Sequence, residues 1–130
     1  MALNDPLANV MSSILNYEKV GKKELDVRIS NKIIKKVLDI MKENSYIDKY
    51  DINKDNSGEF LKIYLLGNIN KCGVIKPRFS VKKENYEKFE KRFLPAKGFG
   101  FLIVSTPQGI MVHEEAKVKG IGGKLIAYIY

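Results

Sequence analysis

Apolar residues recur along this chain at two different periods, so its fold must contain both helices and strands. Over residues 6–17 they follow the three-and-four spacing of one helix face. Residues 25–29 instead alternate between apolar and polar, as the residues of a half-buried strand do. A second helical pattern follows Ser30, which is a suitable helix cap. The two periods predict the α+β fold class.

The first half of the chain is expected to end in a β-hairpin. Residues 47–52 and 60–66 have the composition of strands, and Asp55-Asn56-Ser57-Gly58 between them is a strong turn signal. Asp5 and Pro6 mark the start of the first helix, and Gly21 suits its end. Residues 1–66 are therefore predicted to form an N-terminal lobe of order α-β-α-β-β.

The second half of the chain has shorter elements and more breaks. Residues 67–83 are predicted to be extended, residues 84–93 and 114–119 to be short helices, and residues 99–106, 110–112 and 124–130 to be strands. Turns are expected at Pro107-Gln108-Gly109 and at the glycine loop 120–123. Residues 67–130 are thus predicted to form a second, mostly β lobe.

The positive charge of the 130-residue chain is concentrated in this second half. The net charge is +8; residues 1–65 carry 11 basic and 10 acidic side chains, and residues 66–130 carry 12 and 5. A basic half beside a neutral half favours a polyanionic partner, usually a nucleic acid. The alternative is a solvated basic surface that only keeps the protein soluble.

Several protein classes are not expected from the sequence. No stretch approaches the roughly 20 apolar residues of a membrane span, and residues 1–6 do not resemble a secretory signal. A single cysteine, Cys72, cannot form an internal disulfide, which suits a reducing cytoplasm. The sequence therefore predicts a cytoplasmic protein.

Catalytic and metal chemistry find little support in the sequence. His113 and Cys72 are the only residues of their kinds, and no third group is evident to orient them as a nucleophile and a base. Zinc needs about four ligands, of which the chain offers two good ones. His113 is expected to be a helix cap or a surface residue, and no enzyme activity, metal or cofactor is predicted.

The glycine loop with Lys124 does not match a nucleotide-binding loop. That motif requires a glycine where Val118 stands and a hydroxyl residue where Leu125 stands. Exposed backbone N–H groups of the loop could still meet a phosphate. A tight turn that needs positive φ is the favoured interpretation.

The polar face of the first helix carries no charge between residues 6 and 17. Asn9, Ser12, Ser13 and Asn16 occupy it. Small neutral groups suit close approach to a phosphate or a protein, and a weakly polar exposed face is the equal alternative. Three lysines of the second helix, Lys32, Lys35 and Lys36, are expected to face solvent or an anion.

Residues 97–104 nearly match the conserved strand of an RNA-recognition module. In such a module Phe99 and Phe101 would stack on unpaired bases, and residues 63–65 would imitate the partner strand. The predicted order of elements argues against this fold, because Pro95 interrupts the region where one required strand would lie. Single-strand RNA binding is the alternative function.

Several long motifs resemble the small-ribosomal-subunit protein eight family, in its archaeal and eukaryotic type. Residues 67–79 (GNINKCGVIKPRF) and 94–100 (LPAKGFG) resemble that branch. Ser105-Thr106 with Gly109-Ile110-Met111 resembles the family's Ser-Thr-Ser-x-Gly-Val-Met signature. Residues 5–9 and 121–128 resemble its beginning and its end. The resemblance covers the chain from Asp5 to Tyr130 in order.

The resemblance implies a two-lobed α+β fold and binding to an irregular stem in the central domain of small-subunit rRNA, early in assembly. It assigns the Ser-Thr turn to the RNA, and Pro107 replaces the family's third hydroxyl. Lys124 stands where bacterial relatives tend to carry an acid. The candidate RNA-binding residues are Asn4, Asn9, Ser13, Lys32, Lys71, Lys76, Arg78, Ser105, Thr106, Gln108, Gly109, Gly122, Gly123 and Lys124.

The expected partners are small-subunit rRNA and neighbouring ribosomal proteins, with no membrane. The free protein is expected to be a monomer. Some bacterial members also bind the messenger RNA of their own operon, and binding to its own transcript is left open for this chain.

Overall fold

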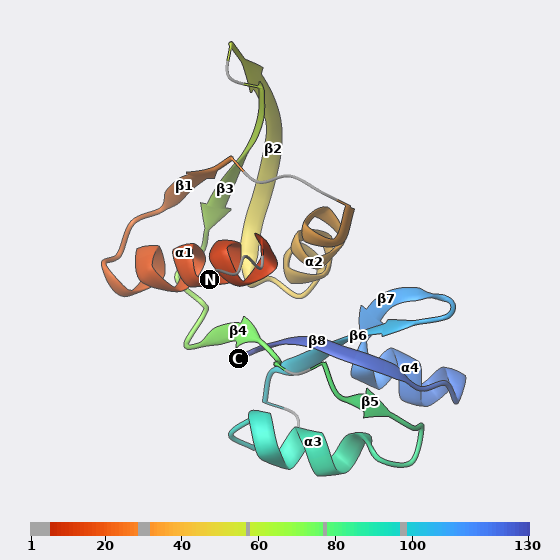
Figure 1. The fold of residues 1–130 in the computed structure, drawn as a ribbon. Helices are drawn as coiled ribbons and strands as arrows, with labels where there is room; N and C mark the ends of the chain where they lie inside the picture. The colour runs from red at the N-terminus through yellow and green to blue at the C-terminus, as the bar shows by residue number, and fades with distance from the viewer. Residues whose placement is uncertain (1–5, 29–31, 57, 77, 97–98) are drawn as a thin grey trace. The chain divides into compact units, whose positions relative to one another are not determined.

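The fold is taken from a computed structural model that describes residues 6–28, 32–56, 58–76, 78–96 and 99–130. The contacts divide the chain into two compact units, one ending at Ile69 and one running from Asn70 to Tyr130. The charge pattern puts the predicted boundary at Gly67. Both units combine helices with antiparallel strands (Figure 1), which confirms the α+β fold class.

The first unit has the predicted order α-β-α-β-β. Its elements are α1 (Pro6–Lys19), β1 (Glu24–Val27), α2 (Lys32–Glu43), β2 (Ile47–Asp55) and β3 (Gly58–Leu65). The three strands form an antiparallel sheet of order β1-β3-β2. The apolar stripes of α1 and α2, including Ile14 and Met41, are buried, as their spacing predicts.

Helix α1 ends as Gly21 predicts. Gly21 has φ of 75° and its N–H donates to Glu18, while the N–H of Lys22 donates to Tyr17. These two bonds satisfy carbonyls that the helix leaves open at its end, and the left-handed conformation they need is cheap only for glycine. The predicted caps Asp5 and Ser30 lie outside the described residues.

In the residues described, the second unit contains one sheet and two short helices. Its elements are β4 (Cys72–Val74), β5 (Ser80–Val81), α3 (Tyr86–Phe93), β6 (Phe101–Thr106), β7 (Gly109–Val112), α4 (His113–Lys119) and β8 (Gly123–Ile129). The sheet order is β4-β8-β6-β7, and β5 also pairs with β8. Residues 67–83, which are predicted only as extended, thus contribute two short strands.

Both helices of the second unit cover the same face of its sheet (Figure 1). Tyr86 and Phe89 of α3 and Ala116 of α4 share one buried core with Val104 and Leu125 of the sheet. Since side chains alternate along a strand, the residues next to Val104 and Leu125 point to the other face. The sheet therefore leaves one face free of both helices.

Candidate nucleic-acid interface

Three polar side chains lie in one row on the face of the second unit's sheet that α3 and α4 do not cover. Lys124 of β8 pairs with Ser80 of β5 on one side and with Ser105 of β6 on the other. Directly paired residues project to the same face of a sheet, and all three are exposed. We call Ser80, Lys124 and Ser105 the hydroxyl–lysine row.

The row unites two residues of the sequence prediction and adds one that it misses. Strand β7 and helix α4 lie between Ser105 and Lys124 in the chain, and only the pairing of β6 with β8 makes the two residues neighbours. Ser80 is not predicted because β5 is only two residues long. A strand that short leaves no period-two pattern to read.

The turn beside the row is held by Thr106. Its hydroxyl Oγ1 donates to the carbonyl of Gly109 at 2.7 Å and accepts the N–H of Gln108 at 3.2 Å. Thr106 is buried, whereas Pro107, Gln108 and Gly109 are exposed. Thr106 therefore shapes the turn, and Ser105 is the member of the Ser-Thr pair whose side chain reaches the surface.

Two glycines allow β8 to approach its neighbouring strands closely. A Cβ on Gly123 would collide with the backbone of Ser105, and a Cβ on Gly122 would collide with the backbone of Val81. Positive φ occurs at Gly120, where it ends α4. The predicted need for positive φ thus applies to Gly120, while Gly122 and Gly123 serve close approach between strands.

The buried core also supports the glycine loop. Tyr86, which is fully buried, donates its hydroxyl to the carbonyl of Ile121 at 3.0 Å. Next to it, Leu125 donates its N–H to the carbonyl of Phe79 at 2.9 Å. These bonds fix the start of β8, so Lys124 projects from a backbone held on both sides.

The other candidate residues divide between the two units. Lys71, Lys76 and Arg78 are exposed in the second unit. Asn9, Ser13 and Lys32 belong to the first unit. Asn9 is exposed, Ser13 is half-buried, and Lys32 is exposed at the start of α2. Asn4 lies outside the described residues.

A shallow hollow lies beside the neutral face of α1. Its volume is about 220 Å³. Asn9 and Ser13 line it on one side, and on the other side it is lined by Asp26 and Val27 of β1 and by Arg28, which follows β1. Arg28 is paired with Asp55 at 2.7 Å. The neutral face of α1 therefore borders charged groups that are already partly compensated.

The expectation that His113 is a cap or a surface residue is wrong. Its side chain is 1% exposed. Its Nδ1 accepts the N–H of Leu102 at 3.0 Å, and its Nε2 lies 2.6 Å from the carboxylate of Glu90. The acceptor role of Nδ1 places the ring proton on Nε2, which donates to Glu90.

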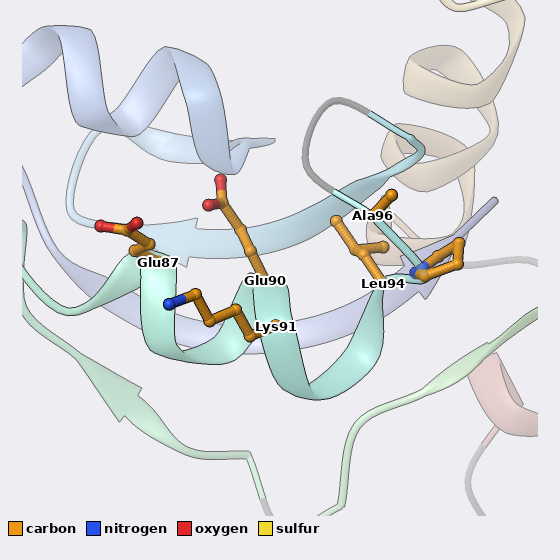
Figure 2. A pocket seen from close by; sticks show the side chains of 6 residues that line it. Glu87, Glu90, Lys91, Leu94 and Ala96 are labelled. Atoms are coloured by element: carbon orange, nitrogen blue, oxygen red, sulfur yellow. The ribbon is translucent and has the colours of Figure 1, made fainter.

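The carboxylate of Glu90 also receives a hydrogen bond from Lys117 at 2.6 Å. Figure 2 shows Glu90 projecting from α3 at the edge of a hollow of about 160 Å³, lined also by Glu87, Lys91 and Leu94. Burial alone would raise the pKa of Glu90, but the hydrogen bonds from Lys117 and His113 outweigh it and lower the pKa. The group is held as a structural anion.

The RNA-recognition fold, and with it the stacking role of Phe101, is also contradicted. Phe101 is 4% exposed, so its ring cannot stack on bases from solvent. Residues 63–65, the supposed partner strand, belong to β3 in the sheet of the other unit. Phe99 remains half exposed. The sequence match therefore reflects glycine and apolar content in a different fold.

Within the ranges described, no three His, Cys, Asp or Glu side chains gather as metal ligands. No helix in the described part of the chain is long and apolar enough to cross a membrane. Cys72 is buried.

A comparison with protein families matches residues 5–130 to the family described as ribosomal protein S8. The match covers nearly the whole chain, including the hydroxyl–lysine row and its turn. Proteins of this family are structural proteins of the small ribosomal subunit in the cytoplasm; they bind rRNA and are not enzymes. The chain therefore belongs to the ribosomal protein S8 family.

Proposed function

We propose that this protein binds an irregular stem in the central domain of small-subunit rRNA and helps that domain to assemble. The observation that carries the proposal is the exposed pairing of Ser105 with Lys124 on the sheet face that α3 and α4 do not cover. It places a short side chain with a hydroxyl beside a cation on the surface of a sheet. This combination suits RNA whose backbone and bases come within reach together.

The chemistry of double-stranded RNA favours such a surface. A-form RNA hides its deep major groove and displays 2′-hydroxyls and distorted bases in a shallow minor groove. Ser105 can both donate and accept a hydrogen bond there without holding the backbones apart. Lys124 supplies one phosphate contact, and Ser80 offers a second hydroxyl on its other side.

The turn extends this surface. Gln108 presents an exposed amide, and Gly109 presents exposed backbone that no side chain covers. Pro107 has no N–H to offer, so its part of the turn contributes shape alone. Thr106, Gly122 and Gly123 act indirectly, because they fix the turn and let β8 approach β6.

The remaining candidates supply charge and close contact on the same RNA. Lys71, Lys76 and Arg78 would neutralise phosphates from the second unit. Lys32 and the neutral residues Asn4, Asn9 and Ser13 would contact the sugar–phosphate backbone from the first unit. These assignments follow from residue chemistry and from membership of the family.

The test is filter binding to two RNAs of equal length, one an irregular central-domain stem and one unstructured. We expect the stem to bind more tightly and Ser105→Ala to weaken it by roughly 5- to 30-fold, as the loss of a hydrogen bond worth about 1–2 kcal/mol requires. Unfolding curves of the variant serve as the control for folding. Equal affinity for both RNAs, or no effect of Ser105→Ala, would contradict the proposal.

A further inference from the structure

Four aromatic rings form a continuous row along one edge of the second unit. Phe93 lies 5.8 Å from Tyr128, Tyr128 lies 6.3 Å from Tyr130, and Tyr130 lies 6.4 Å from Phe99, measured between ring centroids. The first two pairs have nearly parallel planes, with interplanar angles of 23° and 24°. We call these four residues the aromatic row.

Part of the row is open to solvent. Phe99 is 49% exposed, and the other three side chains are half-buried. Phe93, Tyr128 and Tyr130 rest on the buried core of the second unit. The core therefore supports one side of the row, and its other side is partly exposed to solvent.

Gly73 makes room for the central ring. It pairs with Tyr128 across β4 and β8, and a Cβ at this position would lie only 3.0–3.3 Å from the hydroxyl and ring atoms of Tyr128. The phenol therefore lies over the bare backbone of β4. Here glycine lets an aromatic ring lie over an edge strand, because a Cβ would require the ring to shift by a few tenths of an ångström.

The aromatic row and the hydroxyl–lysine row lie on opposite faces of the sheet. Tyr128 pairs with Leu102 and packs on the core that α3 covers, and Phe93 is the last residue of α3. Ser105 and Lys124 point away from that core. An RNA stem on the hydroxyl–lysine row would therefore leave the aromatic row uncovered on the other face.

Cations flank the aromatic row. The guanidinium of Arg92 lies 5.5 Å from the centre of the Phe93 ring and 4.9 Å from that of Phe79. At the other end Lys71 exchanges two backbone hydrogen bonds with Tyr130, at 2.8 Å each, and its side chain is exposed. The buried Glu90 is already paired with Lys117 and His113.

We propose that the aromatic row is a second RNA contact, which binds an unpaired strand by stacking bases on Phe99 and Tyr130. Ring faces bind bases of any sequence, and cations beside them neutralise the phosphates that connect those bases. Arg92 and Lys71 stand at the two ends of the row, where a strand crossing it would bring its phosphates. The excess of basic residues in this half of the chain favours RNA over an ordinary protein surface.

The test measures binding of the full chain to a short oligouridylate that contains 5-iodouridine, with Phe99→Leu and Phe60→Leu as matched variants. Phe60 is partly exposed in the first unit and also has a cation over its ring, Arg28 at 4.9 Å. Leucine keeps the apolar volume and removes the ring face in both variants. We expect Phe99→Leu to weaken binding roughly 5- to 30-fold and Phe60→Leu to leave it unchanged.

Ultraviolet crosslinking gives an independent readout, and we expect the modified uridine to attach at Phe99 or Tyr130. Both variants should bind the rRNA stem as the parent chain does, so the result is separate from that of the stem contact. Equal oligouridylate affinity for the two variants, or crosslinks confined to the hydroxyl–lysine row, would overturn the proposal. A third result would also overturn it: Phe99→Leu leaves oligouridylate binding unchanged, but reconstituted subunits that contain this variant lose a neighbouring ribosomal protein. The aromatic row would then bind a protein and not RNA.

Discussion

Gly123 determines how closely Ser105 and Lys124 can lie. The backbone of Ser105 occupies the space in which a Cβ of residue 123 would lie. We expect Gly123→Ala to destabilise the protein by about 1–3 kcal/mol, the usual cost of forcing extra volume into a packed site, and to weaken stem binding. Urea unfolding measures the first effect. An unchanged unfolding midpoint would show that β6 and β8 can separate without cost.

Glu90 gives the protein a predictable acid sensitivity. Its folded-state pKa is lowered from 4.5, so the ionised carboxylate stabilises the fold at neutral pH. That contribution is lost as the pH falls from about 4.5 through the folded-state pKa. We expect Glu90→Gln to reduce stability at neutral pH by about 1–3 kcal/mol and to flatten the acid limb of the stability profile. Parallel acid limbs for the two proteins would contradict this role.

The roles of Glu90 and His113 could not be read from the sequence. Glu90 lies in a strongly charged helix between Phe89 and Lys91, and nothing local marks it as buried. Its partners His113 and Lys117 come from α4, more than 20 residues further on. Only the packing of α3 and α4 on one face of the sheet brings them together. Periodicity reports which face of an element is apolar, but not which polar side chains meet across a core.

At the scale of elements, the turn between β6 and β7 depends on one hydroxyl. Thr106→Val removes the bonds to Gly109 and Gln108 while keeping the shape of the side chain. We expect it to cost about 1–3 kcal/mol, since two polar backbone groups lose a partner, and to weaken stem binding. Thr106→Ser is the matched control, because it keeps the hydroxyl, and it should stay near the parent in both assays. A Thr106→Val variant as stable as the parent chain would contradict this role, because it would show that the hydroxyl does not hold the turn.

Most helices and strands were predictable because their signals are local. The apolar spacing of α1, Gly21 at its end and the turn residues 55–58 each act through neighbouring residues. The end of α2 was less evident, since Ser45 takes φ of 63° where glycine is usual. β5 was missed because its two residues depend on pairing with Lys124 and Gly123 of β8. A strand that forms only because it pairs with a distant strand has little strand pattern in its own sequence.

For the whole molecule, the uneven charge predicted a polyanion partner, and family membership identifies it as rRNA. The sequence also named most of the proposed surface, because long motifs resemble the family. It could not show that Ser105 and Lys124 are adjacent, that Thr106 turns inward, or that Phe101 is buried. Those facts depend on strand register and on packing between distant segments. Charge therefore indicated the type of partner, and the fold indicates which face would meet it.

If RNA binds at the hydroxyl–lysine row, as we propose, the affinity for the stem must depend on salt concentration and on Lys124. With about six phosphates neutralised, the logarithm of affinity should fall with the logarithm of salt concentration at a slope of about −4 to −5. Lys124→Gln should reduce that slope by about one. The control is Lys91→Gln, which removes the same charge from exposed Lys91 on α3, on the other side of the sheet.

We expect a shallower slope and weaker binding for Lys124→Gln, with Lys91→Gln close to the parent chain. The two variants carry the same net charge, so a general electrostatic attraction would change both slopes alike. Equal slopes for Lys124→Gln and Lys91→Gln would contradict this proposal, because they would show that RNA does not contact the face that carries Ser105 and Lys124.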